Sequence, residues 1–165
     1  MTSREYFPLL PESAGPDWLD HYVEQYELPS AVNVSAWTDL LGEDPELFRK
    51  RLWMEESFAL RDVEWSLKSA KHIHELCETI NGNPPSTWHV INWSSAWDRS
   101  LKIKDFFELN PGSLPGRLTV IDIADTLHIV DGYHRIALLQ NRCSILGNYI
   151  RENPIVKCCF GRHTS

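Results

Sequence analysis

The chain has 165 residues, of which 42% are apolar and 24% charged, an ordinary globular composition that excludes intrinsic disorder. Its formal net charge of -7 opposes non-specific binding to nucleic acid, which requires a basic face. The chain shows neither an apolar signal segment nor a run of about 20 apolar residues, so we expect a cytoplasmic protein with no membrane contact.

Short helices are expected in the first third of the chain. Prolines interrupt the amino-terminal segment, where only residues 17–26 favour a helix. Ser35 is a candidate N-cap for a second helix over residues 36–41. The pair Asp44-Pro45 is typical of a helix start, and the apolar positions that follow it continue as far as Trp53.

The middle of the chain holds the best helical pattern, with apolar residues at steps of three and four over residues 60–80. His72 and His74 lie two apart on this helix and point to different faces, so we expect no metal pair there. The alternation of side chains over residues 88–93 favours a strand, and residues 98–109 are ambiguous, with one possible helical face.

A β-hairpin followed by a helix is predicted in the last third of the chain. Two short β-branched runs over residues 118–130 flank Ala124-Asp125-Thr126, which has the chemistry of a hairpin turn. Asp131-Gly132 stops the second strand. From Tyr133 the apolar spacing becomes helical, and Asn141 lies near the expected end of that helix.

The junction between this strand and this helix favours an anion site. A helix start leaves backbone N–H groups unpaired, and Gly132 lets a ligand approach the backbone closely. His134 and Arg135 lie in the first turn, where Arg offers a bidentate fork for phosphate and His a hydrogen bond. Asp131 could bind Mg²⁺, accept a hydroxyl proton or cap the helix. The alternative is an ordinary surface pair, or Arg135 bound to a nearby carboxylate.

The run Asp131-Gly132-Tyr133-His134-Arg135-Ile136-Ala137-Leu138-Leu139, with the hairpin before it, resembles the ParB/sulfiredoxin superfamily. Residues 153–158 are similar to the strand that follows this helix in the family, so the resemblance covers roughly residues 115–159. It implies phosphate or nucleotide binding, with ATP or ADP and Mg²⁺ as cofactors. The implied cofactor-binding residues are Gly132, Tyr133, His134 and Arg135; the implied catalytic residues are Asp131 and His134, with Asp131 also as metal ligand.

The motif departs from two branches of that superfamily. Tyr133 stands where sulfiredoxins place a nucleophilic Cys, so we do not expect sulfinic-acid repair. The chromosome-partition members carry a Glu and a second Arg in the motif and a helix-turn-helix after it, so a role in DNA segregation is not expected either. The form with Asp first and His-Arg last is most similar to the members that act as free-serine kinases, which implies a phosphotransferase.

Other chemically conspicuous residues have plain structural explanations. Asp122 interrupts an apolar strand, and strict alternation makes it an outward-facing residue. Cys158-Cys159 is expected to fill a terminal strand with small apolar side chains, with a redox or metal role as the alternative. Any second carboxylate of the anion site stays open among several candidates, which are Glu64, Asp98, Asp105 and Asp122.

We therefore expect an α+β fold in a single domain over residues 1–165. A mostly helical extension, residues 1–85, would pack on a core over residues 86–165 that contains a small mixed sheet. The expected function is a nucleotide- or phosphate-binding enzyme, a phosphotransferase or phosphohydrolase that acts on a small metabolite. Two alternatives stay open: a non-catalytic binding or regulatory module whose tryptophan-rich amino-terminal half holds a protein partner, and a metal-dependent nuclease.

Overall fold

The computed structural model describes residues 1–14, 17–83, 90–110, 116–140 and 155–163, and every structural statement below refers to these residues. The fold class is α+β, as predicted. The elements in chain order are α1 (Ser3–Tyr6), α2 (Asp17–Tyr26), α3 (Val34–Leu41), α4 (Pro45–Phe48), β1 (Leu52–Ala59), α5 (Leu67–Ile80), α6 (Val90–Leu109), β2 (Leu118–Ile123), β3 (Thr126–Asp131), α7 (Tyr133–Gln140) and β4 (Ile155–Arg162). Short 3₁₀ turns cover Glu12–Ala14 and Leu60–Asp62.

The four strands form one mixed sheet in the order β1-β4-β2-β3. β4 pairs parallel with β2, whereas the β1–β4 and β2–β3 pairs are antiparallel. The β2–β3 hairpin confirms the predicted strands, but its loop has two residues rather than three. Ala124 and Asp125 both have positive φ angles, 47° and 65°, as a tight hairpin turn requires. Thr126 belongs to β3, and its hydroxyl donates to the Ile123 carbonyl at 2.6 Å.

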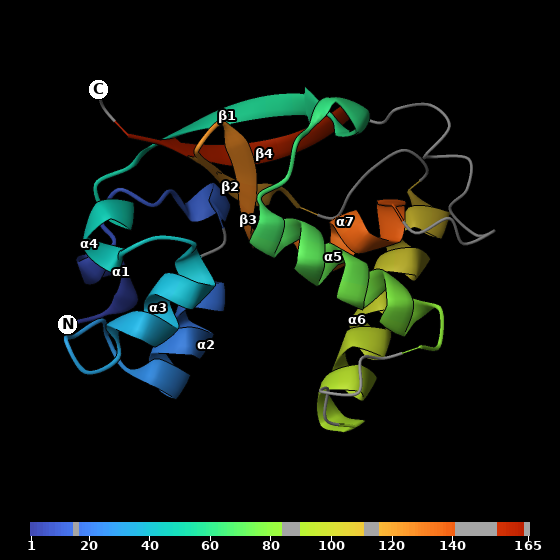
Figure 1. Ribbon diagram of the computed structural model, residues 1–165, viewed down its shortest axis with the longest axis horizontal. Coiled ribbons are helices and arrows are strands. Elements are labelled where there is room, and N and C mark those ends of the chain that lie inside the picture. Colours follow the sequence, from blue (N-terminus) through green and yellow to red (C-terminus); the bar gives the residue numbers. More distant parts are fainter. Residues whose placement is uncertain (15–16, 84–89, 111–115, 141–154, 164–165) are drawn as a thin grey trace.

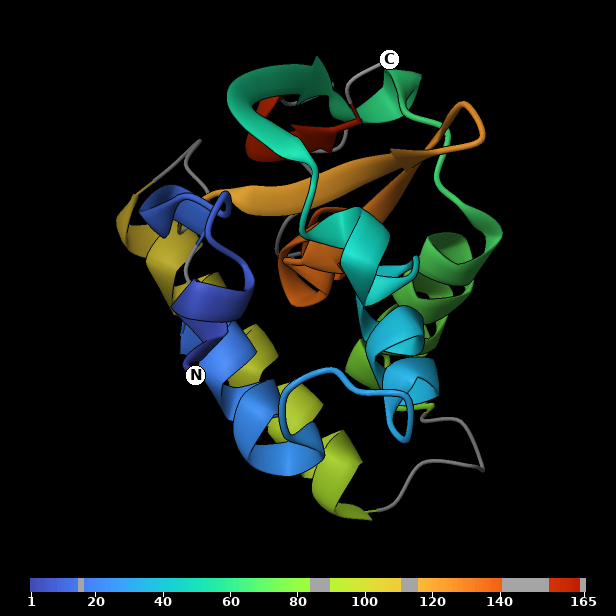
Figure 2. The same cartoon turned by 90° about the vertical axis from the view of Figure 1, so that its left-hand side faces the viewer.

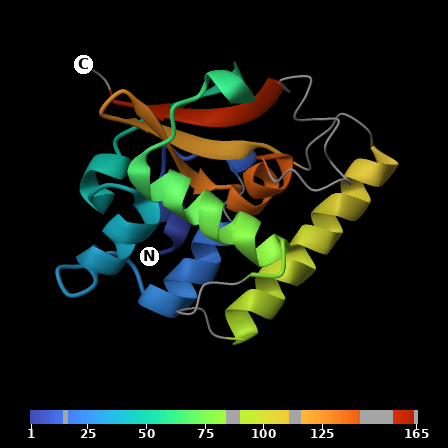
Figure 3. The same cartoon turned by 45° about the vertical axis from the view of Figure 1, so that its right-hand side comes forward.

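Both faces of the β2–β3 hairpin are buried, against two different groups of helices. Val120 and Ile129 belong to a core cluster shared with α5, α7 and β4. Their neighbours Ile121 and Val130 point to the opposite face and join a second cluster built on α1–α4. In Figure 1 the β2–β3 hairpin descends between the two groups, with α1–α4 on the left and α5–α7 on the right. Figure 2 shows the sheet above both groups, and Figure 3 shows α5, α6 and α7 lying together.

Strand β1 is an element that the sequence analysis missed. Its first residues, Leu52 and Trp53, were expected to continue a helix that begins at Pro45, but that helix ends at Phe48. β1 is an edge strand, and side chains exposed or half-exposed along its whole length leave no clear two-residue alternation in the sequence. The strand conformation is decided by pairing with β4, in which Glu56 lies opposite Cys158.

Three further boundaries differ from the predictions. Residues 90–93 belong to α6 and not to a strand, and residues 88–89 lie outside the described residues. The alternation of side chains that predicted the strand is short, and α6 continues well beyond it to Leu109. α5 begins at Leu67 rather than residue 60, because the Ser66 hydroxyl caps it by accepting the Ser69 N–H at 3.1 Å. α3 has Asn33, not Ser35, at its N-cap position.

The two adjacent cysteines of β4 are packing residues, as expected. Cys158 and Cys159 are both buried, one on each face of the sheet. Burial raises the pKa of the Cys158 thiol to about 12, so this sulfur is not a nucleophile at neutral pH. No helix within the described residues combines the length and the apolar character needed to cross a bilayer.

A buried arginine ties the sheet to the amino-terminal helices. Arg51, only 2% exposed, donates to both carboxylate oxygens of Glu43 at 2.5 and 2.9 Å. It also donates to the Asp122 carboxylate at 2.5 Å and to the Gly161 carbonyl at 2.7 Å. Asp122 is half-exposed, as its place in the strand predicts, but its carboxylate is committed to this network.

We expect Arg51→Ala to lower the free energy of unfolding by about 3 kcal/mol, because it removes the buried donor shared by the Glu43 and Asp122 carboxylates and the Gly161 carbonyl. Urea denaturation measures the change. Arg4→Ala is the control, since its ion pair with Glu12 is exposed on both sides and should contribute less than about 0.5 kcal/mol. Equal effects of the two substitutions would contradict the role given to Arg51.

Candidate functional site: a pocket at the start of α7

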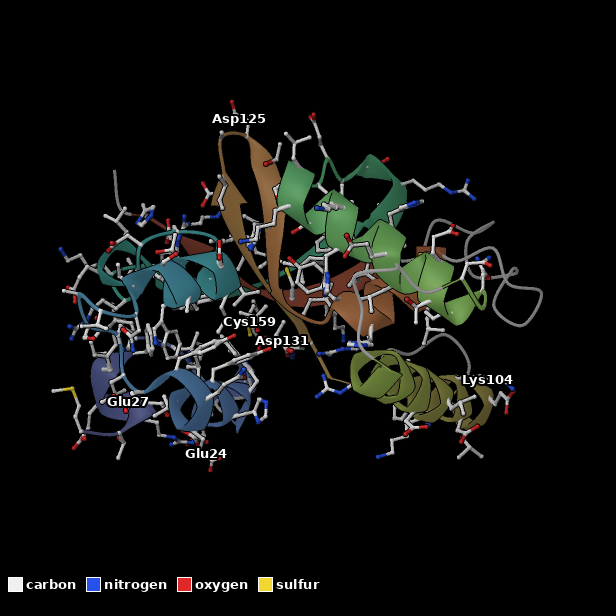
Figure 4. All side chains as sticks on the ribbon, turned by 60° about the horizontal axis from the view of Figure 1, so that its bottom comes forward. Glu24, Glu27, Lys104, Asp125, Asp131 and Cys159 are labelled. Carbon is white, nitrogen blue, oxygen red and sulfur yellow. The ribbon has the colours of Figure 1, made fainter. Side chains whose placement is uncertain are left out.

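A cavity of about 440 Å³ opens where β3 ends and α7 begins. It lies between the two groups of helices, and Figure 4 shows Asp131 between α2 and α6. Its walls come from α2, α5, α6 and the β3–α7 junction, through the residues Trp18, His21, Tyr22, His72, Arg99, Val130, Asp131, Gly132, Tyr133 and His134. The predicted strand-turn-helix segment thus forms one wall of a concave site.

Gly132 makes the sharp turn from β3 into α7. Its φ angle is +112°, and a Cβ at this position would collide with the Leu118 side chain, so only glycine fits. The first intrahelical bond of α7 runs from the Ile136 N–H to the Gly132 carbonyl at 3.2 Å. The N–H groups of the preceding first-turn residues therefore have no partner within the helix.

Four of the five predicted site residues line this pocket, and Arg135 does not. The Arg135 guanidinium donates through Nη2 to the Asp131 carboxylate at 3.2 Å and through Nη1 to the Arg117 carbonyl at 3.1 Å. Its side chain is 15% exposed. Arg135 therefore holds Asp131 and the start of β2 in place, which is the carboxylate pairing that the sequence left as the alternative.

The cationic side chain in the lining is instead Arg99 on α6, and three imidazoles, those of His21, His72 and His134, lie in the same cavity. Burial lowers the pKa of His134 to about 4, with smaller contributions from Arg99 and His72, so this ring is neutral at pH 7. Burial also lowers the pKa of His72. A neutral imidazole can donate one hydrogen bond and accept another.

Asp131 is the one carboxylate among the pocket-lining residues. Burial raises the pKa of its carboxyl group, against the lowering effects of Arg135 and Arg99. A carboxylate with a raised pKa holds a proton more readily than an exposed one, which suits a proton acceptor. None of the proposed second carboxylates, Glu64, Asp98, Asp105 and Asp122, lines the cavity.

A second cavity of about 370 Å³ adjoins the first and shares Tyr22, His72, Val130 and Tyr133 with it. The rest of its lining consists of Leu40 and four charged residues, Lys68, Lys71, Asp39 and Glu75. Lys68 pairs with Asp39 at 3.0 Å, and Lys71 lies 4.0 Å from Glu75. The charged groups of the first cavity are Arg99 and Asp131, so each of the two cavities combines basic and acidic side chains.

Several residues of this site were missed in the sequence. Arg99 stands in an ambiguous segment with no local motif, and His21, Trp18 and Tyr22 lie on a short amphipathic helix that reads as packing. His72 was considered only as half of a metal pair with His74. Their convergence on Asp131 depends on how α2, α5 and α6 pack, and no spacing within the chain encodes it.

The pocket by itself offers a magnesium ion few protein ligands. Mg²⁺ takes six oxygen ligands in an octahedral arrangement, and in nucleotide sites most of these are phosphate oxygens and waters. The pocket offers a single carboxylate, Asp131, which already accepts a hydrogen bond from Arg135. Across the described residues, no group of three His, Cys, Asp or Glu side chains is placed to hold a metal ion.

A buried polar network supports the pocket wall from behind. His128, 2% exposed, lies 3.0 Å through Nδ1 from the Ser66 hydroxyl and 3.3 Å from the Ser69 hydroxyl. Ser69 in turn contacts the Tyr133 hydroxyl at 3.0 Å. The His128 ring packs on Gly42, where a Cβ would collide with it. Burial, with a smaller effect of Lys68, lowers the pKa of His128 to about 4.

Comparisons with known proteins give no independent guide to this site. A scan against models of protein families, a search of curated proteins and a search of solved structures each found no match to the chain. The site is interpreted below from its own geometry and from the resemblance described above.

Two histidines, the buried His128 and the partly buried His134, predict a loss of stability in weak acid. Folding lowers the pKa of His128 and of His134 from 6.5 to about 4, so the unfolded chain binds protons more tightly than the folded protein. Their contribution is complete above pH 6.5 and declines as the pH falls from 6.5 towards 4, by up to about 3 kcal/mol for each histidine.

Chemical denaturation from pH 7 to pH 4 measures this decline. His128→Asn removes one titrating group and should flatten the curve of stability against pH. His74→Asn, a change at an exposed position on α5, should leave the shape of that curve unchanged. A His128→Asn curve parallel to that of the unsubstituted protein would contradict the assignment.

Proposed function

We propose that this chain binds a small phosphorylated molecule, such as the nucleotide ATP or ADP, in the pocket at the start of α7. The carrying observation is the set of hydrogen-bond donors that gathers in one cavity. Its lining brings together the Arg99 guanidinium, three imidazoles and the start of α7, with Asp131 as its one carboxylate. Donors of this kind suit an anion such as phosphate, and the cavity has the size of pockets for small molecules.

The residues have complementary tasks in such a complex. The Arg99 guanidinium offers the fork that pairs with phosphate oxygens, and the first-turn N–H groups of α7 lie beside His134 at the same wall. Neutral His134 adds a hydrogen bond without a further charge. Trp18 and Tyr22 supply aromatic faces on which a nucleobase can stack.

The resemblance to the ParB/sulfiredoxin superfamily extends this proposal to phosphoryl transfer. A nucleotide supplies the phosphoryl group, and this chain orients it and manages the proton. Asp131, whose pKa is raised, is placed to accept the proton of an acceptor hydroxyl or of water, while Arg99 offsets the charge on the phosphate oxygens. Asp131 is the one carboxylate of the pocket that could hold a Mg²⁺ ion brought by the nucleotide, and such an ion would offset charge on the phosphate oxygens.

Binding without turnover is the second candidate, and one observation favours it. Asp131 is the single carboxylate of the pocket and already bonds to Arg135, so the site is better equipped to hold an anion than to move a proton. A partner held by exposed tryptophans has less support, because Trp37 lies in the core and Trp18, Trp53 and Trp65 are only partly exposed.

Isothermal titration with ATP, ADP, pyrophosphate and phosphate, with and without Mg²⁺, tests the binding proposal. We expect Arg99→Gln to weaken binding about ten-fold, since it removes a charged donor to phosphate. Lys102→Gln, an exposed change on the same helix outside both cavities, should stay within about two-fold. No heat from any ligand with folded protein would overturn the proposal.

Asp131→Asn separates the enzyme from the binding module. Asn keeps an oxygen that can accept from Arg135, so we expect ligand affinity and thermal stability to change little. It cannot take a proton, so phosphate transfer or release from ATP should fall at least about 100-fold if Asp131 is the base. Turnover is followed by phosphate release; turnover equal to that of the unsubstituted protein would exclude Asp131 as the base.

A further inference from the structure

Ser69, on α5, is the junction of the buried network behind the pocket. Its side chain is fully buried, and three groups lie within hydrogen-bond distance of its hydroxyl oxygen. These are the Ile129 N–H at 2.9 Å, the Tyr133 hydroxyl at 3.0 Å and His128 Nδ1 at 3.3 Å. Tyr133 lines both cavities, so the network connects the core to the wall of the site.

The direction of the hydrogen bonds follows from the number of protons available. A backbone N–H can only donate, so Ile129 occupies one lone pair of Ser69. The Ser69 hydroxyl has one proton left to give, and it can go either to His128 Nδ1 or to the Tyr133 oxygen. Which of them receives it depends on whether Nδ1 itself carries a proton.

The environment of the other ring nitrogen decides this. His128 Nε2 is buried and has no hydrogen-bond partner. A buried N–H without an acceptor is rarer in proteins than a buried acceptor without a donor. His128 is neutral at pH 7, so a bare Nε2 puts the single ring proton on Nδ1, where the hydroxyl oxygens of Ser66 and Ser69 can accept it.

We propose that this tautomer of His128 makes the Tyr133 hydroxyl a hydrogen-bond donor to the anion bound in the pocket. With Nδ1 protonated, Ser69 gives its proton to the Tyr133 oxygen, and the Tyr133 proton is left to point away from Ser69. Tyr133 is then a binding residue that favours an oxyanion over a cation, and Ser69 and His128 are positioning residues. The inference rests on the proposed function, because the acceptor is the phosphate of that ligand.

The tautomer can be observed directly and without any ligand. Nitrogen-15 NMR of the imidazole rings distinguishes a protonated Nδ1 from a protonated Nε2, and the signals of His128 are those missing from His128→Asn. We expect Nδ1 to carry the proton at pH 7. A proton on Nε2 would overturn the inference whether or not the protein binds phosphate compounds.

Pyrophosphate titration tests the donor itself. Tyr133→Phe keeps the ring and removes only the hydroxyl, and we expect it to weaken pyrophosphate binding about ten-fold. Tyr26→Phe makes the same change on α2 outside both cavities and should stay within about two-fold. An affinity of Tyr133→Phe within two-fold of the unsubstituted protein would contradict the role of Tyr133.

The relay through Ser69 has its own spectroscopic signature. Saturating pyrophosphate should shift the His128 Nδ1 signal, because a stronger bond at Tyr133 polarises the chain through Ser69. Ser69→Ala should abolish that shift, whereas Ser66→Ala, which also removes a hydroxyl beside Nδ1 but none beside Tyr133, should retain it. A shift that persists in Ser69→Ala excludes the relay. If pyrophosphate does not bind at all, the proposed function fails, and the tautomer measurement still decides the hydrogen-bond arrangement.

Discussion

The β2–β3 hairpin buries both of its faces, and the arrangement of the helices follows from that requirement. Val120 and Ile129 point to one side of the sheet and Ile121 and Val130 to the other, and all four are nearly inaccessible to water. Each face therefore needs its own layer of helices. α1–α4 supply one layer and α5 with α7 the other, as Figure 1 shows. The candidate site is the cavity at the end of β3, which takes its walls from both layers.

The polar groups of the cavity then determine what it can hold. An arginine, three imidazoles and one carboxylate, Asp131, converge on the end of β3. Arg135 contributes indirectly, because its hydrogen bonds to Asp131 and to the Arg117 carbonyl hold the Asp131 carboxylate in place between β3 and α7. With His134 neutral at pH 7, the site offers hydrogen bonds in several directions and a concentrated charge only at Arg99.

The buried polar groups divide into two kinds of network with different consequences. Around Arg51 every hydrogen bond has a partner, because the guanidinium donates to two carboxylates and two backbone carbonyls and so links the sheet to the amino-terminal helices. Around His128 the ring nitrogen Nε2 has no hydrogen-bond partner. We infer from this that the ring proton lies on Nδ1, which sets the direction of the hydrogen bonds through Ser69. This second network ends at Tyr133, which lines the pocket. The position of the proton on the buried His128 therefore affects a side chain that a ligand would contact.

The sequence by itself determined the elements whose signals are local. Turn residues and β-branched runs defined the β2–β3 hairpin, the Asp131-Gly132 break placed the start of α7, and the amphipathic pattern placed α2. It also brought Asp131, Gly132, Tyr133 and His134 to one site, because they are consecutive. Only the tertiary structure decided the rest. β1 is a strand because β4 lies beside it, and Arg99 reaches the pocket because α6 packs against α5 and α7. Arg135 turns to Asp131 because the fold places that carboxylate and the Arg117 carbonyl within its reach. Contacts between distant segments leave no periodic trace in the chain, so packing alone could reveal them.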